Sequence, residues 1–177
     1  MSAPYLLSSL PTLELGAQAP FTPEEYRHQC EGIEGLNLGD LDAVAIGIAG
    51  SHPFTVAYAN ALLEIKSTTA AMRASGWEGE NIRVSERSYA GCHVDLQQKI
   101  IEACNIKNPY EREVALEKAR WQIVEELAGI GYFSEAKIYA YIIKLQINNR
   151  LAGLSDEQGK ANIEEFIKAN DREVAQN

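Results

Sequence analysis

Residues 134–152 read Ser134-Glu-Ala-Lys-Ile-Tyr-Ala-Tyr-Ile-Ile-Lys-Leu-Gln-Ile-Asn-Asn-Arg-Leu-Ala152, the clearest helical pattern in the chain. Apolar side chains recur there at helical spacing in two stripes: Ile138, Ile142 and Leu145, then Tyr139, Ile143, Ile147 and Leu151. The narrow gap between the stripes holds Lys137, Lys144 and Asn148, with Tyr141 at its edge. At roughly 1.5 Å per residue, the pattern predicts a helix about 28 Å long that is packed on two sides. Only the gap is expected to reach water.

Two polar residues lie near the end of this helix. Asn149 lies beside the first stripe and Arg150 beside the second. A cation next to apolar surface needs a hydrogen-bond partner, so we expect a carboxylate or carbonyl close to Arg150. An internal ion pair or a cap for the helix end is favoured over a docking role, which remains the alternative.

The preceding segment predicts a second long helix from Asn108-Pro109 to Ala128, which Gly129 and Gly131 end. One broad apolar stripe consists of Leu116, Ala119, Ile123, Val124 and Leu127. Trp121 falls on the other side, near Val114 and Tyr110. Two apolar faces require two neighbours. One is the core of the domain, and the other is either a further helix of this chain or a partner protein.

The rest of the chain predicts a mainly α protein: a single helical domain over 1–177, with six or seven helices and an irregular N-terminal segment. Residues 1–20 are expected to be extended, because Pro4, Pro11 and Pro20 disfavour helix in the residues before them. Thr22-Pro23 begins a helix that ends by Gly32 and Gly35. Further helices are predicted over 53–73 and 94–104, and a last one from Ser155. Residues 76–91 form a long polar connection, the best candidate for a partner-facing loop.

Residues 43–50 are ambiguous between strand and helix. Val44, Ile46 and Ile48 alternate with small residues, and a strand followed by the turn Gly47–Pro53 at a helix N-terminus would suit a phosphate. The turn has the spacing Gly-x-x-Gly-Ser, without the third glycine of a dinucleotide site or the lysine of a P-loop. Two helices joined at Gly50-Ser51, with Ser51 capping the second, are therefore favoured.

Composition narrows the class of protein. Hydrophobic residues at 46% and charged ones at 23% are typical of a globular protein. The net charge of −9 argues against nucleic acid as a partner. Three cysteines, Cys30, Cys92 and Cys104, are an odd number, which favours a reducing compartment. Residues 43–63 lack charge, but their glycines, proline and alanines argue against a membrane span.

Acidic residues gather in the segment 21–42. It holds Glu24, Glu25, Glu31, Glu34, Asp40 and Asp42 against Arg27 alone. A solvated acidic face is the favoured interpretation, and a docking face for a basic partner is the alternative.

No pattern predicts catalysis, a cofactor or a metal. The histidines His28, His52 and His93 are scattered, and adjacent Cys92-His93 side chains would diverge on a helix. There is no Gly-x-Ser-x-Gly elbow, and the pairs Glu125-Glu126 and Glu164-Glu165 face apart on helices. We therefore expect a protein that is not an enzyme.

A family resemblance gives a more specific expectation. The stretch from Phe133 to Arg150 resembles the helix in the C (eukaryotic d) subunit of rotary V/A-type ATPases, in which an aromatic-rich turn leads to a lysine, a polar residue and then Asn-x-Arg or Asn-Arg. Tyr5-Leu-Leu-Ser-Ser-Leu-Pro11 and Tyr141-Ile-Ile-Lys-Leu-Gln-Ile-Asn-Asn-Arg150, followed by Gly159, more closely resemble a bacterial family of proteins encoded beside V-type ATPase subunits. The pair Arg120-Trp121 also fits that family.

The resemblance implies a non-catalytic, cytoplasmic subunit or accessory of a V-type ATPase. Its partners would be other subunits of the stalk or membrane ring, and it would meet the membrane only through the complex. The candidate contacts are Trp121, Tyr141, Lys144, Asn149 and Arg150. The alternatives are a small-molecule or nucleotide-binding protein that uses Gly47–Pro53, and a helical adaptor unrelated to the ATPase.

Overall fold

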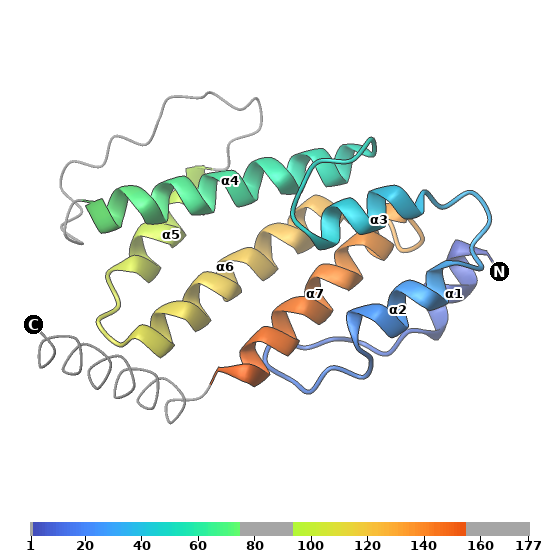
Figure 1. Ribbon diagram of the computed structural model, residues 1–177, viewed down its shortest axis with the longest axis horizontal. Helices are drawn as coiled ribbons and strands as arrows, with labels where there is room; N and C mark the ends of the chain where they lie inside the picture. Colours follow the sequence, from blue (N-terminus) through green and yellow to red (C-terminus); the bar gives the residue numbers. More distant parts are fainter. Residues whose placement is uncertain (1, 75–93, 155–177) are drawn as a thin grey trace, which may run out of the picture.

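The computed structural model describes residues 2–74 and 94–154, which form seven helices and contain no strand (Figure 1). The helices are α1 (Ala3–Ser9), α2 (Pro23–Cys30), α3 (Leu38–Ala45), α4 (Pro53–Ala74), α5 (Val94–Cys104), α6 (Pro109–Ala128) and α7 (Glu135–Gly153). The predicted mainly α fold is confirmed. The predicted bounds of α2 and α4 to α7 hold to within a residue or two, the usual uncertainty of a helix end.

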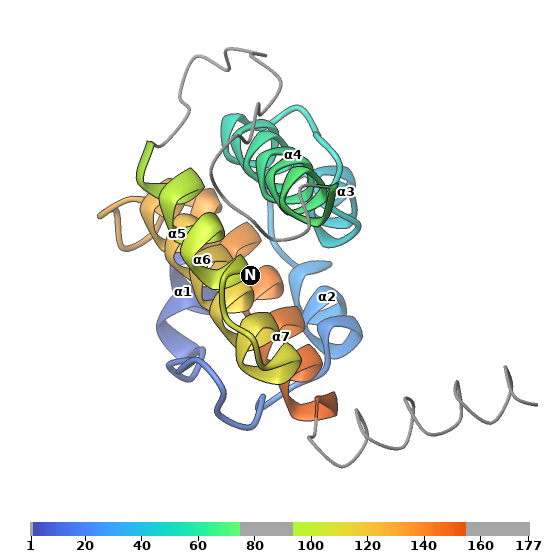
Figure 2. The same ribbon diagram turned by 90° about the vertical axis from the view of Figure 1, so that its left-hand side faces the viewer.

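Helix α7 lies in the middle of the molecule beside α6, and the two run antiparallel (Figure 1). It also contacts α1, α2, α3 and α4, which cover it on several sides (Figure 2). Both predicted stripes are buried, since Ile138, Ile143, Leu145 and Ile147 are fully inaccessible. The prediction of a helix packed on two sides is confirmed.

Helix α6 divides the core in two. Trp121 and Val124 belong to the larger apolar cluster, which α6 shares with α7 and the N-terminal helices. Ala119 and Ile123 belong to a smaller cluster with side chains of α4 and α5. The second neighbour of α6 is therefore a helix of the same chain, and one of the two sequence alternatives is confirmed.

Residues 3–9 correct the expectation of an extended N-terminal segment over 1–20. They form α1, whose first turn holds Pro4, where a missing N–H costs no intrahelical hydrogen bond. Leu6 is 2% exposed in the larger cluster, so burial stabilises this short helix. The irregular segment that we predicted is confined to residues 10–21.

The segment 43–50 is not a strand. Asn37 caps α3 by accepting a hydrogen bond from the Gly39 N–H, and the helix ends before Gly47, whose φ is 74°. No second strand is present in residues 2–74 and 94–154 to pair with this segment, so a strand there would leave its backbone groups unpaired. Ile46 and Ile48 lie exposed in the link to α4.

The predicted cap of α4 is wrong. Ser51 does not cap α4, because the Phe54 N–H donates to Nδ1 of His52 instead. The Ser134 side chain makes no capping hydrogen bond to α7. By contrast, Thr22 and Glu25 form a reciprocal capping box on α2, as Thr22-Pro23 predicted for this helix start.

Three predictions fall outside the described residues: the polar connection over 76–91, the pair Cys92-His93 and the helix from Ser155. Among the helices that are described, none has both the length and the apolarity to cross a membrane.

Candidate functional site

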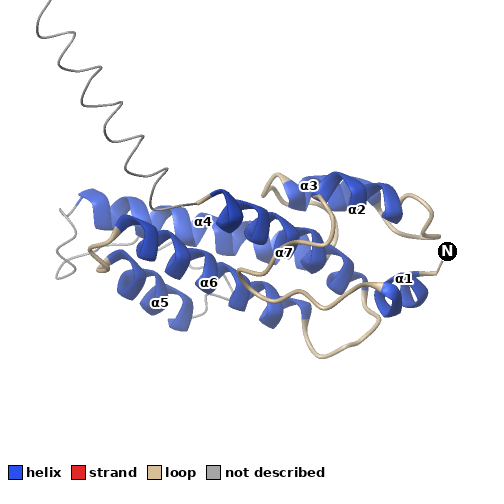
Figure 3. Ribbon diagram, turned by 90° about the horizontal axis from the view of Figure 1, so that it is seen from below, coloured by secondary structure: helices blue, strands red, loops and turns tan. Residues whose placement is uncertain are grey.

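An open groove of about 520 Å³ lies between the N-terminal segment and the start of α7. Figure 3 shows α1 at the same end of the molecule as the connection from α6 to α7. The groove is lined from three parts of the chain: Leu7, Leu10, Pro11, Thr12 and Leu13; Glu125, Ala128 and Tyr132; and Lys137, Ala140, Tyr141 and Lys144. We call it the α1–α7 groove.

Two predicted contact residues, Lys144 and Trp121, contact each other next to this groove, and only Lys144 of the two lines it. The ammonium Nζ of Lys144 lies 4.6 Å from the centroid of the Trp121 ring and 2.8 Å from Glu125 Oε1. Trp121 is 6% exposed, so it supports Lys144 from within the core and offers little surface to a partner. The cation–π contact and the ion pair together fix the lysine side chain across the α6–α7 interface.

Tyr141 also lines the α1–α7 groove, where it fixes the N-terminal segment. Its hydroxyl donates to the Pro11 carbonyl at 3.0 Å, and its ring centroid is 4.8 Å from that of Tyr26. Burial raises the pKa of Tyr141 to about 12, so the phenol keeps its donor proton at neutral pH. Tyr141 therefore shapes the groove wall.

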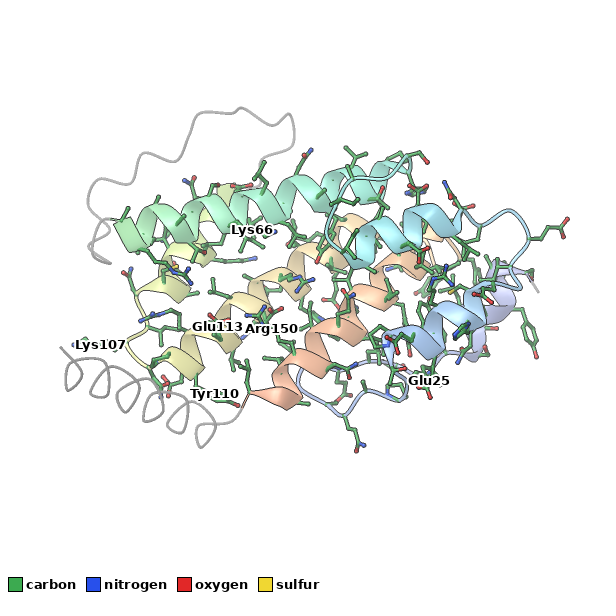
Figure 4. All side chains as sticks on the ribbon, viewed as in Figure 1. Glu25, Lys66, Lys107, Tyr110, Glu113 and Arg150 are labelled. Carbon is green, nitrogen blue, oxygen red and sulfur yellow. The ribbon has the colours of Figure 1, made fainter. Side chains whose placement is uncertain are left out.

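Arg150 lies one to two helical turns beyond Lys144 on α7 and belongs to a different cluster. Its guanidinium pairs with Glu113 at 2.7 Å and with Glu117 at 3.3 Å, and Figure 4 shows Glu113 and Arg150 side by side. Glu117 is 5% exposed and also faces Arg120 at 3.4 Å. The expected carboxylate partner of Arg150 is confirmed. Asn149 is exposed and lies outside the groove lining.

Asn148 corrects our expectation that it lies in the gap open to water. It is 1% exposed, and its side-chain amide bonds the N-terminal segment twice. Oδ1 accepts from the Gly16 N–H and Nδ2 donates to the Glu14 carbonyl, both at 2.9 Å. Because its partners lie more than 130 positions away, helical periodicity gives no sign of them.

The sequence reasoning also missed the most exposed apolar side chains near the groove. Ile130 is 93% exposed, Tyr132 83% and Phe133 58%, all in the connection between α6 and α7. We call these three residues the aromatic turn. The available signal was that these apolar residues stand among Gly129, Gly131 and Ser134. Residues of this kind predict a turn, and a turn at the surface leaves apolar side chains exposed. Tyr132 belongs to both the turn and the groove lining.

The Gly47–Pro53 turn already holds an anion of this chain. The Asp40 carboxylate, 3% exposed, accepts from the Ser51 N–H and from Ser51 Oγ. A Cβ on Gly50 would collide with this carboxylate. The Phe54 N–H points to His52, so the backbone donors do not converge on a free position. An anionic ligand would have to displace Asp40.

The acidic segment 21–42 uses most of its carboxylates internally. Arg27 pairs with both Asp42 and Glu31, and Glu25 completes the α2 cap. Two of the three cysteines are described, and Cys30 and Cys104 are both free and buried. No group of His, Cys, Asp and Glu side chains within residues 2–74 and 94–154 could hold a metal ion.

Comparison of the chain with known protein families, with curated proteins and with solved structures gives no match.

Proposed function

We propose that this chain is a non-catalytic subunit or accessory of a V-type rotary ATPase that acts by protein–protein contact. The partner class comes from the resemblance of Tyr5–Pro11 and Tyr141–Arg150 to the family encoded beside V-type ATPase subunits. The observation that supports docking is the aromatic turn, an exposed apolar group that continues into the α1–α7 groove. Exposed apolar groups of this kind are typical of protein interfaces.

The framework around the groove suits a mechanical role. Lys144 ties α7 to α6 through Trp121 and Glu125, and Tyr141 and Asn148 tie the N-terminal segment to α7. A groove whose walls are fixed before binding loses less conformational entropy when a partner docks. A connector in a rotary machine needs this stiffness more than it needs reactive side chains.

Four of the five predicted contacts take a supporting role in this proposal, and Asn149 has no role in the groove. Tyr141 and Lys144 shape the groove. Trp121 holds Lys144 in place through its ring, and Arg150 stabilises the packing of α6 against α7. The direct contacts are the aromatic turn and the open groove floor.

The test is affinity capture of the tagged full chain from native membranes solubilised at low salt, with captured proteins identified by mass spectrometry. We expect V-type ATPase subunits to be captured, and the double change Ile130→Ser with Tyr132→Ser to reduce their amount at least about tenfold. The matched control is Ile46→Ser with Ile48→Ser, two exposed apolar residues of the α3–α4 link. Absence of every rotary ATPase subunit, or equal loss in the control, would overturn the proposal.

A further inference from the structure

Lys137 stands out among the residues that line the α1–α7 groove. It lies in the first turn of α7, and its side chain is half-buried. Its ammonium forms no ion pair or hydrogen bond with any residue of 2–74 and 94–154. An ammonium at the groove without a counter-ion is available to pair with a carboxylate that a partner brings.

The other lysine of the groove is already neutralised. Lys144 pairs with Glu125 at 2.8 Å, and Glu125 is the only carboxylate among the described residues that line the groove. Lys137 is therefore left as a net positive charge inside the groove. Its own helix does not stabilise it, because the N-terminal end of a helix favours anions.

Charge and apolar surface lie next to each other here. The half-buried leucines Leu7, Leu10 and Leu13 give the groove an apolar wall, and Tyr132 connects it to the aromatic turn. The chain as a whole carries a net charge of −9, which repels an acidic segment at long range, so the attraction for a carboxylate is local to Lys137. An unpaired cation in such a setting selects for a carboxylate at one position of the partner.

The geometry points to an acidic amphipathic segment as the occupant of the α1–α7 groove, with its apolar side chains on the leucine wall and a carboxylate on Lys137. This inference rests on the proposed function, which makes the segment part of a V-type ATPase subunit. One apolar residue next to one Asp or Glu satisfies both features of the groove, whereas a basic segment would meet Lys137 with like charge.

Zero-length carbodiimide crosslinking tests this pairing directly, because the reagent joins an amine to a carboxylate only when the two are in contact. The tagged full chain is incubated with solubilised native membranes, crosslinked and analysed by mass spectrometry. The Lys144–Glu125 pair within the chain serves as the positive control for the reaction. We expect a second crosslink, from Lys137 to an Asp or Glu of a V-type ATPase subunit.

Substitutions of Lys137 distinguish the effect of its charge from its ability to form the amide crosslink. Lys137→Arg keeps the positive charge but cannot form the amide, so capture should persist while the crosslink disappears. Lys137→Glu should reduce capture at least about tenfold. Lys118→Glu is the matched control, because Lys118 is an exposed lysine of α6 outside the groove and its reversal changes the net charge equally.

The two proposals can fail separately. If V-type ATPase subunits are captured but Lys137→Glu leaves their amount unchanged, or Lys137 crosslinks only to carboxylates of its own chain, the acidic occupant is excluded and the proposed function stands. If no V-type ATPase subunit is captured, both proposals are overturned.

Discussion

The ammonium of Lys144 lies 4.6 Å from the centre of the Trp121 ring, across the interface between α7 and α6. The same nitrogen pairs with Glu125, so one side chain links a core aromatic residue to the rim of the groove. The lysine side chain is only 19% exposed, which weakens solvent screening of its contact with the ring, whereas Glu125 is 53% exposed and the ion pair is screened by water. The position of Lys144 in the wall of the α1–α7 groove therefore depends on how α6 packs against α7.

Replacing Lys144 by Met should lower the free energy of unfolding by about 0.5–1.5 kcal/mol, because the methylene packing is kept and the charge contacts are lost. Urea denaturation followed by circular dichroism measures the change. Lys144→Arg keeps the cation over the ring and should cost less than Lys144→Met. An equal loss in both variants would mean that the charge contributes nothing.

Glu117 and Glu113 both pair with Arg150, but their surroundings differ. The Glu117 side chain is 6% exposed and also faces Arg120, whereas that of Glu113 is 30% exposed. Glu117→Gln should cost about 1–3 kcal/mol, since it leaves two guanidinium groups under-compensated next to buried surface. Glu113→Gln should cost less than about 1 kcal/mol, as for an exposed pair. The same denaturation measurement decides the order, and a larger cost for Glu113 would contradict it.

The two long helices and the ion pair of Arg150 could be predicted because the chemistry that fixes them is local. Repeated apolar residues at helical spacing predict α6 and α7, and an arginine beside an apolar stripe predicts a carboxylate or carbonyl partner. The groove could not be predicted in this way. Its walls come from residues 7–13, 125–132 and 137–144, and only the tertiary fold brings these three segments together.

Asn148 is a single residue whose surroundings could not be predicted for the same reason. Its place in the gap of α7 was predicted, but the N-terminal segment covers that gap. This segment hydrogen-bonds both the oxygen and the nitrogen of the side-chain amide. Ile46 and Ile48 show the reverse case, since their alternation indicated a strand although no partner strand exists within the described part of the chain. Short periodic patterns do not carry information about distant neighbours.

Asn148→Ala should loosen the N-terminal wall of the groove. The Gly16 N–H would lose its partner and the Glu14 carbonyl would keep only the Ala17 N–H, at a cost of about 1–3 kcal/mol. Hydrogen exchange should then speed up at Gly16 and at its neighbours in residues 10–21. Asn149→Ala, on the exposed neighbouring residue, is the control and should leave exchange unchanged. Unaltered protection of Gly16 in Asn148→Ala would contradict the role given to this amide.

Because of Asp40, the free energy of unfolding should depend on pH in the acidic range. Burial alone raises the pKa of this carboxyl, but the hydrogen bonds from Ser51 and the interactions with His52 together outweigh burial, and the net pKa lies below its ordinary value. A carboxyl whose pKa is lowered by folding stabilises the folded state above its unfolded pKa, and the effect is lost as pH falls through the folded pKa. The difference in unfolding free energy between wild type and Asp40→Asn should therefore be constant from pH 5 to 8, at about 1–3 kcal/mol, and shrink below about pH 4. A difference that does not change down to pH 2 would show that the charge of Asp40 plays no part.

The most direct test of docking through the aromatic turn is photo-crosslinking in living cells, with a photoreactive phenylalanine analogue placed at Tyr132 or, as control, at Ile46. Both positions are strongly exposed, at 83% and 73%, so the probe reaches solvent equally well in the two proteins. We predict that the probe at 132 crosslinks to a V-type ATPase subunit and that the probe at 46 does not. Crosslinks from 132 that contain no rotary ATPase subunit, or the same subunit reached from both positions, would contradict the proposed docking surface.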